Sequence, residues 1–152
     1  KTITFRHTSE GTGWGAVYAR YQEKVEDVEA LSSGFTITRT VVPNTYRAGD
    51  RVKVQITVTA DRDYDFVQIV DKRAACMEPV RQLSGYSSGA YVSTKDTATH
   101  YSILKLTKGT HTFETEYYID REGTYLYAPV TVQCAYAPEF SAHSKTDIIE
   151  VK

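Results

Sequence analysis

Alternation of apolar and polar residues is the feature that most constrains the fold of this chain. Val52, Val54, Ile56 and Val58 occupy every second position, which places them on one face of a strand. Similar patterns recur, with turn residues between them about every ten residues, as in an antiparallel sandwich. They cover residues 2–6, 14–21, 35–41, 66–70, 100–106, 110–119, 123–135 and 148–151. We therefore predict an all-β, immunoglobulin-like sandwich with roughly seven to nine short strands in two antiparallel sheets.

Three stretches interrupt this pattern. Residues 22–31 are acidic, with apolar residues at helical spacing but no clear cap, so they fit a short helix or a linker equally well. Residues 71–98 lose the alternation and accumulate Gly, Ser and Thr, which predicts one long irregular excursion at a sheet edge. Pro129 interrupts residues 123–135, which indicates an edge strand or a bulge there.

Composition supports strands and excludes several classes of function. The chain has 12 tyrosines and 5 phenylalanines, which suit a pleated, half-buried surface. With 18 basic and 19 acidic residues, it lacks the basic excess of a nucleic-acid module. No apolar run of about 18 residues predicts membrane insertion. The start carries neither Met nor a signal-peptide core, so we expect a piece of a longer protein.

The chemistry-bearing residues form no recognisable catalytic, cofactor or metal motif. The four histidines lack metal-ligand spacing, and no phosphate-binding glycine loop or nucleophile elbow is present. Asp61, Asp63 and Asp65 alternate like the start of a calcium loop, but the required Gly and the distal Glu are missing. The prediction is therefore a chain that is not an enzyme, with no catalytic, cofactor-binding or metal residues. The histidines are His7, His100, His111 and His143.

The two cysteines allow two interpretations. Cys76 and Cys134 are either two free buried thiols or one disulfide, and two cysteines do not fix the redox compartment. Cys76 begins the sequence Cys-Met-Glu-Pro, which is similar to the Cys-x-Glu-Gln motif of internal thioesters. Its fourth residue, Pro79, has no side-chain amide to supply the acyl group, so a thioester cannot form here.

Two ordered blocks of sequence resemble the last macroglobulin-like domain of bacterial alpha-2-macroglobulins. The first block runs from Gly49 to Asp71. The second block consists of residues 108–117, 121–125, 128–130 and 136–140. It follows the pattern with which sequences of that family close, which is Gly-x, a strand, a second Gly-x, a second strand and then Met-Tyr-x-Pro-Glu. The resemblance covers most of residues 33–152 and implies a macroglobulin-like sandwich there. Residues 1–32 resemble the hairpin and linker that lead into this domain.

This resemblance implies a part in a protease trap. The expected function is a non-catalytic C-terminal domain of a bacterial endopeptidase inhibitor that packs against a separate, thioester-type helical domain. The expected partners are the other domains of the parent chain and, through the full-length protein, target proteases. The expected location is the periplasmic side of the bacterial cell envelope, with lipid anchoring of the parent left open.

The resemblance also singles out two residues. The family's Met-Tyr pair is associated with shielding the thioester from water, and here it corresponds to Ala135 and Tyr136. Alanine in place of methionine puts this shielding in doubt, and an anchor for a strand crossing is an equally good interpretation of Tyr136. The competing hypothesis for the whole chain is a carbohydrate-binding or adhesive cell-surface sandwich, in which tyrosines form a stacking platform.

Overall fold

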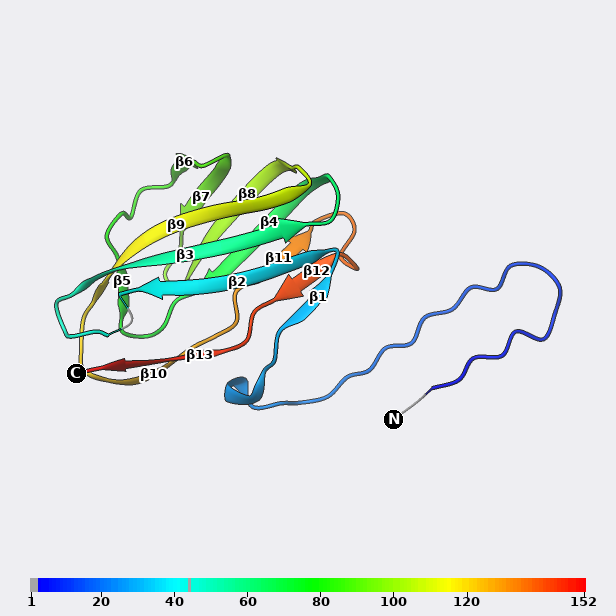
Figure 1. Cartoon of the computed structure of the whole chain (residues 1–152), viewed down its shortest axis with the longest axis horizontal. Coiled ribbons are helices and arrows are strands. Elements are labelled where there is room, and N and C mark those ends of the chain that lie inside the picture. The colour runs from blue at the N-terminus through cyan, green and yellow to red at the C-terminus, as the bar shows by residue number, and fades with distance from the viewer. Residues whose placement is uncertain (1–2, 44) are drawn as a thin grey trace.

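The computed structural model describes residues 3–43 and 45–152 and shows an antiparallel β-sandwich, as predicted (Figure 1). The larger sheet has seven strands in the order β1-β12-β11-β4-β8-β7-β6. Its strands are β1 (Leu31–Ser33), β4 (Tyr64–Lys72), β6 (Gly85–Ser87), β7 (Ala90–Thr94), β8 (Ala98–Leu106), β11 (Thr131–Cys134) and β12 (Ser141–His143).

Four strands form the facing sheet, and two more form a separate ladder. The four-stranded sheet has the order β2-β3-β9-β5, with β2 (Phe35–Val42), β3 (Arg51–Ala60), β5 (Met77–Pro79) and β9 (Gly109–Ile119). Figure 1 shows it lying across the seven-stranded sheet. The two-stranded ladder pairs β10 (Gly123–Tyr127) with β13 (Asp147–Val151).

The core between the sheets confirms the strongest sequence prediction. Val52, Val54, Ile56 and Val58 on β3 are all almost fully buried, because alternation turns every second side chain of this central strand inward. The neighbouring strand β9 adds Phe113 and Tyr117 on the same side. Burying such side chains is the main favourable contribution to a fold of this type.

Aromatic rings join the two sheets. Phe35 of β2 and Tyr64 of β4 lie 4.2 Å apart between ring centroids, and Tyr101 of β8 lies 5.5 Å from Phe113 of β9. The hydroxyl of Tyr117 forms a 2.8 Å hydrogen bond with Thr99 on the opposite sheet. The buried tyrosines therefore connect the sheets through both packing and hydrogen bonds.

Two expectations for irregular regions need correction. The excursion at residues 71–98 is partly regular, since it holds β5, β6 and β7 and buries Ala74, Cys76 and Ala90. Residues 123–135 do not form one interrupted strand. They form β10 and β11, which belong to different sheets on either side of Pro129, because proline has no amide hydrogen with which to continue a ladder.

The N-terminal part differs from the predicted hairpin. Residues 3–24 form no helix or strand, and their side chains are exposed; Figure 1 shows this segment extending away from the sandwich. The alternating pattern has no sheet face to cover here, so no ladder forms. Lys1 and Thr2 lie outside the described residues. A short 3-10 turn at Val25–Asp27 follows, and the domain boundary between residues 32 and 33 stays a prediction.

In the described part of the chain, no helix has the length and apolar character needed to cross a bilayer.

Alkaline unfolding is the first testable consequence of the buried tyrosines. Burial raises the pKa of Tyr101, Tyr117 and Tyr127 in the folded state, whereas an unfolded tyrosine ionises near pH 10. A folded pKa above the unfolded one stabilises the fold fully below about pH 10, and this contribution is lost as the pH rises further. The ionisation of these three buried tyrosines, followed by tyrosinate absorbance, should therefore coincide with the loss of circular dichroism. A single reversible step near pH 10 for all tyrosines, with the fold intact, would contradict this.

Candidate functional site

Tyr136 lies on the surface just after β11 ends at Cys134. Its side chain is 81% exposed, and its ring meets the ring of Phe66 edge-on, with 5.1 Å between centroids. The amide of Ala135 donates a 2.8 Å hydrogen bond to the carbonyl oxygen of Phe66 on β4. The structure thus presents the predicted tyrosine to solvent, on a short segment that strand β4 holds in place.

Further apolar side chains surround the pair of Tyr136 and Phe66 on the outer face of the seven-stranded sheet. Leu104 is 70% exposed, and Tyr86 and Tyr91 form an exposed edge-to-face pair with centroids 5.2 Å apart. A hollow of about 500 Å3 lies among these residues. We call this set the outer aromatic surface: Phe66, Tyr86, Tyr91, Leu104 and Tyr136. Contiguous apolar exposure of this kind is typical of an interaction site.

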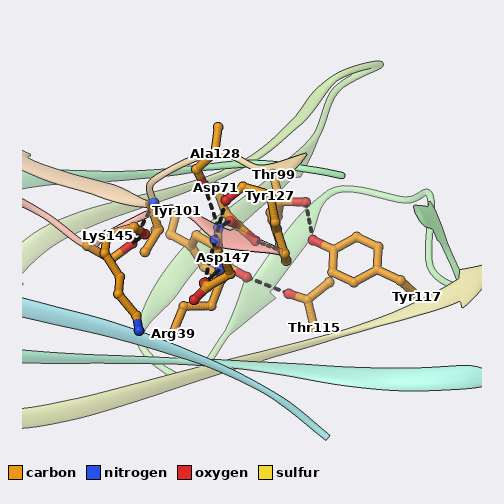
Figure 2. Close-up of polar contacts among 12 residues, drawn as sticks. Arg39, Asp71, Thr99, Tyr101, Thr115, Tyr117, Tyr127, Ala128, Lys145 and Asp147 are labelled. Carbon is orange, nitrogen blue, oxygen red and sulfur yellow. Dashed lines mark hydrogen bonds and ion pairs between the residues drawn. The ribbon is translucent and has the colours of Figure 1, made fainter. Parts of the chain in front are cut away.

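A second cluster is buried where the two main sheets meet the β10–β13 ladder (Figure 2). The Arg39 guanidinium donates to Asp71 at 2.8 Å and to Asp147 at 2.8 and 3.2 Å. It also donates to the carbonyl oxygens of Tyr127 at 2.9 Å and Ala128 at 2.8 Å. These five hydrogen bonds match the five N–H donors of a guanidinium, so all of its donors are used.

The surroundings of this cluster favour the charged form of Arg39. Burial alone would lower the pKa of Arg39, but the charge of Asp71 and the hydrogen bonds to Asp147 and Asp71 raise it. Burial raises the pKa of Asp71, and this effect exceeds the opposing effects of Arg39 and of the Tyr127 hydroxyl, which donates a 2.7 Å hydrogen bond.

The side chains of Arg39 and Asp71 are both fully buried. A substrate therefore has no access to this pair, and its role is to join β2, β4 and the β10–β13 ladder. The guanidinium also stacks on the ring of Tyr127, with its central carbon 3.3 Å from the ring centroid.

Sequence reasoning missed this cluster, although the alternation held a signal for it. On β2 the inward positions continue from Phe35 and Ile37 to Arg39, and on β4 they continue from Val67 and Ile69 to Asp71. An arginine and an aspartate at inward positions need a partner of opposite charge. The ion pair between Arg39 and Asp71 could therefore have been predicted from the sequence.

The two cysteines are free, buried thiols. Cys134 ends β11 in the larger sheet, whereas Cys76 precedes β5 and its carbonyl oxygen accepts a hydrogen bond from the amide of Asp120, just after β9. The structure contains no bond between the two sulfur atoms. Burial raises the pKa of the Cys76 thiol, which reduces the thiolate needed for reactivity.

Two aspartates of the calcium-like pattern, Asp61 and Asp63, have structural roles in the turn before β4, whereas Asp65 lies in β4 itself. Asp61 accepts hydrogen bonds from Arg62 and, at 2.6 Å, from the hydroxyl of Tyr64. Asp63 accepts a 2.8 Å hydrogen bond from the amide of Lys108. Over residues 3–43 and 45–152, no three His, Cys, Asp or Glu side chains gather in a way that could hold a metal ion.

The sequence profile of the bacterial alpha-2-macroglobulin MG10 domain matches residues 20–139. The chain belongs to this family. The match includes Arg39, Asp71 and the Tyr136 segment of the MG10 domain, whereas Asp147 lies beyond it. No curated protein sequence matches the chain.

Solved bacterial alpha-2-macroglobulins share the fold of this MG10 domain. Salmonella alpha-2-macroglobulin reacted with methylamine is 23% identical, with a TM-score of 0.72 over 82% of this chain and 10% of that protein. Escherichia coli alpha-2-macroglobulin activated by porcine elastase is 18% identical, with a TM-score of 0.73 over 82% of this chain and 14% of that one.

A shorter Escherichia coli structure shows the same likeness. The native protein from domain MG7 to its C-terminus is 17% identical, with a TM-score of 0.69 over 81% of this chain and 24% of that one. The MG10 domain thus spans between a tenth and a quarter of the solved proteins it matches. At these identities the comparisons establish its macroglobulin-like sandwich fold.

Proposed function

We propose that this MG10 domain is the non-catalytic terminal domain of a bacterial protease trap and docks through its outer aromatic surface onto the thioester-type helical domain of the parent protein. The observation that carries this proposal is the exposed side chain of Tyr136. This residue begins the Tyr-Ala-Pro-Glu segment, and its ring packs edge-on against the ring of Phe66. A rigid, exposed aromatic ring is a typical anchor of a protein interface.

The chemistry of the surface fits a packing role. Phe66, Leu104 and Tyr136 supply apolar area for burial against another domain. In a parent with a thioester, a ring held over that bond would exclude water, which is the nucleophile that hydrolyses it. The parent would act in the bacterial cell envelope on the periplasmic side, where its partners are its own other domains and the proteases it captures.

Site-specific crosslinking in the full-length parent tests the docking. A photoreactive benzoylphenylalanine replaces Tyr136, and mass spectrometry identifies the peptides it captures. We expect capture of peptides from the helical domain, because an interface ring lies within contact distance of its partner. The matched control places the same group at Tyr118, an exposed tyrosine on the opposite sheet. The same captured peptides from both positions, or none from position 136, would contradict the docking.

The trap itself is tested with a protease and two substrates. A protease held inside the parent should keep its activity on a small chromogenic peptide and lose its activity on a large protein substrate. If both activities persist after the protease has cleaved the parent, the protein is not a trap. This measurement concerns the whole parent, and the crosslinking result for the docking surface does not depend on it.

Carbohydrate binding is the second candidate function, favoured by one feature of the structure. Of the 12 tyrosines, Tyr64, Tyr101, Tyr117 and Tyr127 are buried, whereas Tyr86 and Tyr91 border the hollow on the outer face. Paired exposed rings beside a hollow can stack on sugars. Saturable glycan binding that is lost in Tyr91→Ala would favour this function, and a glycan array without saturable binding would remove it.

A further inference from the structure

Phe66 adopts a backbone conformation that is rare for a bulky side chain. Its φ angle is 56°, in the left-handed region that glycine enters freely and that strains residues with a bulky side chain. The ladder between β4 and β8 pairs Asp65 with Lys105 and Val67 with Ile103, and Phe66 between them is not paired. The strand therefore carries local strain at one position on the outer aromatic surface.

This strain coincides with a shift in which residues face the core. Tyr64 and Val67 both point inward although they lie three positions apart, and the two residues between them are exposed. A glycine at position 66 would allow the same shift without strain. The chain instead carries a phenylalanine whose side chain is 48% exposed. Burial of Tyr64 therefore accounts for the backbone conformation but not for the aromatic side chain.

The side chain and the backbone of Phe66 both hold the segment that bears Tyr136. The Phe66 carbonyl oxygen accepts the Ala135 amide hydrogen at 2.8 Å. The two rings meet at an interplanar angle of 87°, an edge-to-face arrangement that aromatic pairs favour. Phe66 thus fixes both the start of this segment and the orientation of the exposed ring.

We propose that Phe66 is a positioning residue for Tyr136, whose ring it holds ready for docking against the helical domain of the parent. This inference rests on the proposed docking function for its consequence, but the positioning itself is a property of this chain. Holding the ring in advance reduces the ordering cost of binding. On this view the chain tolerates a strained backbone at Phe66 because the position needs an aromatic side chain, although a glycine would be enough for folding.

Two substitutions separate positioning from folding. Phe66→Gly removes the ring and relieves the strain, so we expect a thermal unfolding midpoint at or above that of the unaltered chain. Phe66→Leu keeps apolar bulk but removes the aromatic edge and serves as the second variant if the glycine variant folds poorly. In both variants the NMR resonances of the Tyr136 ring should move toward those of a freely rotating tyrosine, while Phe66→Tyr should retain the shifts of the unaltered chain.

The docking consequence is measured in the full-length parent by crosslinking from position 136. We expect Phe66→Gly to lower the yield of crosslinks to the helical domain by about tenfold, the size of effect typical of an interface anchor, and Phe66→Tyr to restore most of it. Unchanged Tyr136 ring resonances in Phe66→Gly and Phe66→Leu would overturn the positioning. If the resonances move but position 136 never captures the helical domain, the positioning stands and the proposed docking function fails.

Discussion

Replacing Arg39 with methionine is expected to lower the free energy of unfolding by about 3–5 kcal/mol. The substitution keeps the apolar stem but removes all five guanidinium donors. The buried carboxylate of Asp71 then keeps only the hydrogen bond from the Tyr127 hydroxyl, and two carbonyl oxygens lose the donor that Arg39 supplied. Breaking a buried ion pair on one side is costly because the remaining charge stays away from water. Urea unfolding measures the effect as a lower transition midpoint at an unchanged slope.

The matched control for this prediction is an arginine on the surface. Arg51→Met removes an arginine whose side chain is 53% exposed and whose nearest carboxylate, on Glu116, lies 3.7 Å away. Exposed pairs of this kind contribute about 0–1 kcal/mol. The double variant Arg39→Met with Asp71→Asn should lose less than the sum of the two single variants, because it no longer buries an unpaired charge. Equal losses for Arg39→Met and Arg51→Met would contradict the role given to the buried cluster.

Replacing Phe113 with alanine is also expected to lower the free energy of unfolding by about 3–5 kcal/mol. Phe113 lies in the middle of β9, is 3% exposed and packs on Tyr101 of the opposite sheet. Its removal leaves a cavity between two sheets whose strands are held by long ladders, so the site cannot collapse freely. Calorimetry or denaturant unfolding of the purified chain measures the loss.

The control for Phe113 is another large apolar residue with opposite exposure. Leu104→Ala alters a side chain that is 70% exposed on the outer aromatic surface, so its stability should change by no more than about 0.5 kcal/mol. The same variant removes part of the proposed docking surface. A large loss from Leu104→Ala, or a small one from Phe113→Ala, would show that the core and the outer face of the sandwich have been assigned wrongly.

Most of the fold was predictable because alternation fixes which side chains enter the core. The alternation from Val52 to Val58 predicted one face of β3, and all four side chains lie in the core. The pattern failed where strands are short or change sheet. β5 and β6 have only three residues each, too few for alternation to register, and Pro129 marks a change of sheet rather than a bulge.

The candidate site was predictable only in part. The resemblance to the family pointed to Tyr136, but its contact with Phe66 joins residues 70 positions apart. Only the pairing of β11 with β4 brings these two residues together. The sequence also cannot distinguish a left-handed phenylalanine from an extended one. Arg39 binds Asp147, which lies 108 positions away in the sequence. Of this cluster, the sequence pattern could have indicated only the pairing of Arg39 with Asp71, which occupy inward positions on their strands.

The last strand, β13, sets when during its synthesis this domain can become complete. It supplies Asp147 to Arg39 and pairs with β10, and Val151 buries its side chain in the core. A ribosome must therefore release nearly all 152 residues before the arginine, which emerged more than a hundred residues earlier, has its full set of partners. Contacts between such distant positions slow folding, so the nascent domain spends this interval with an unfinished charged core.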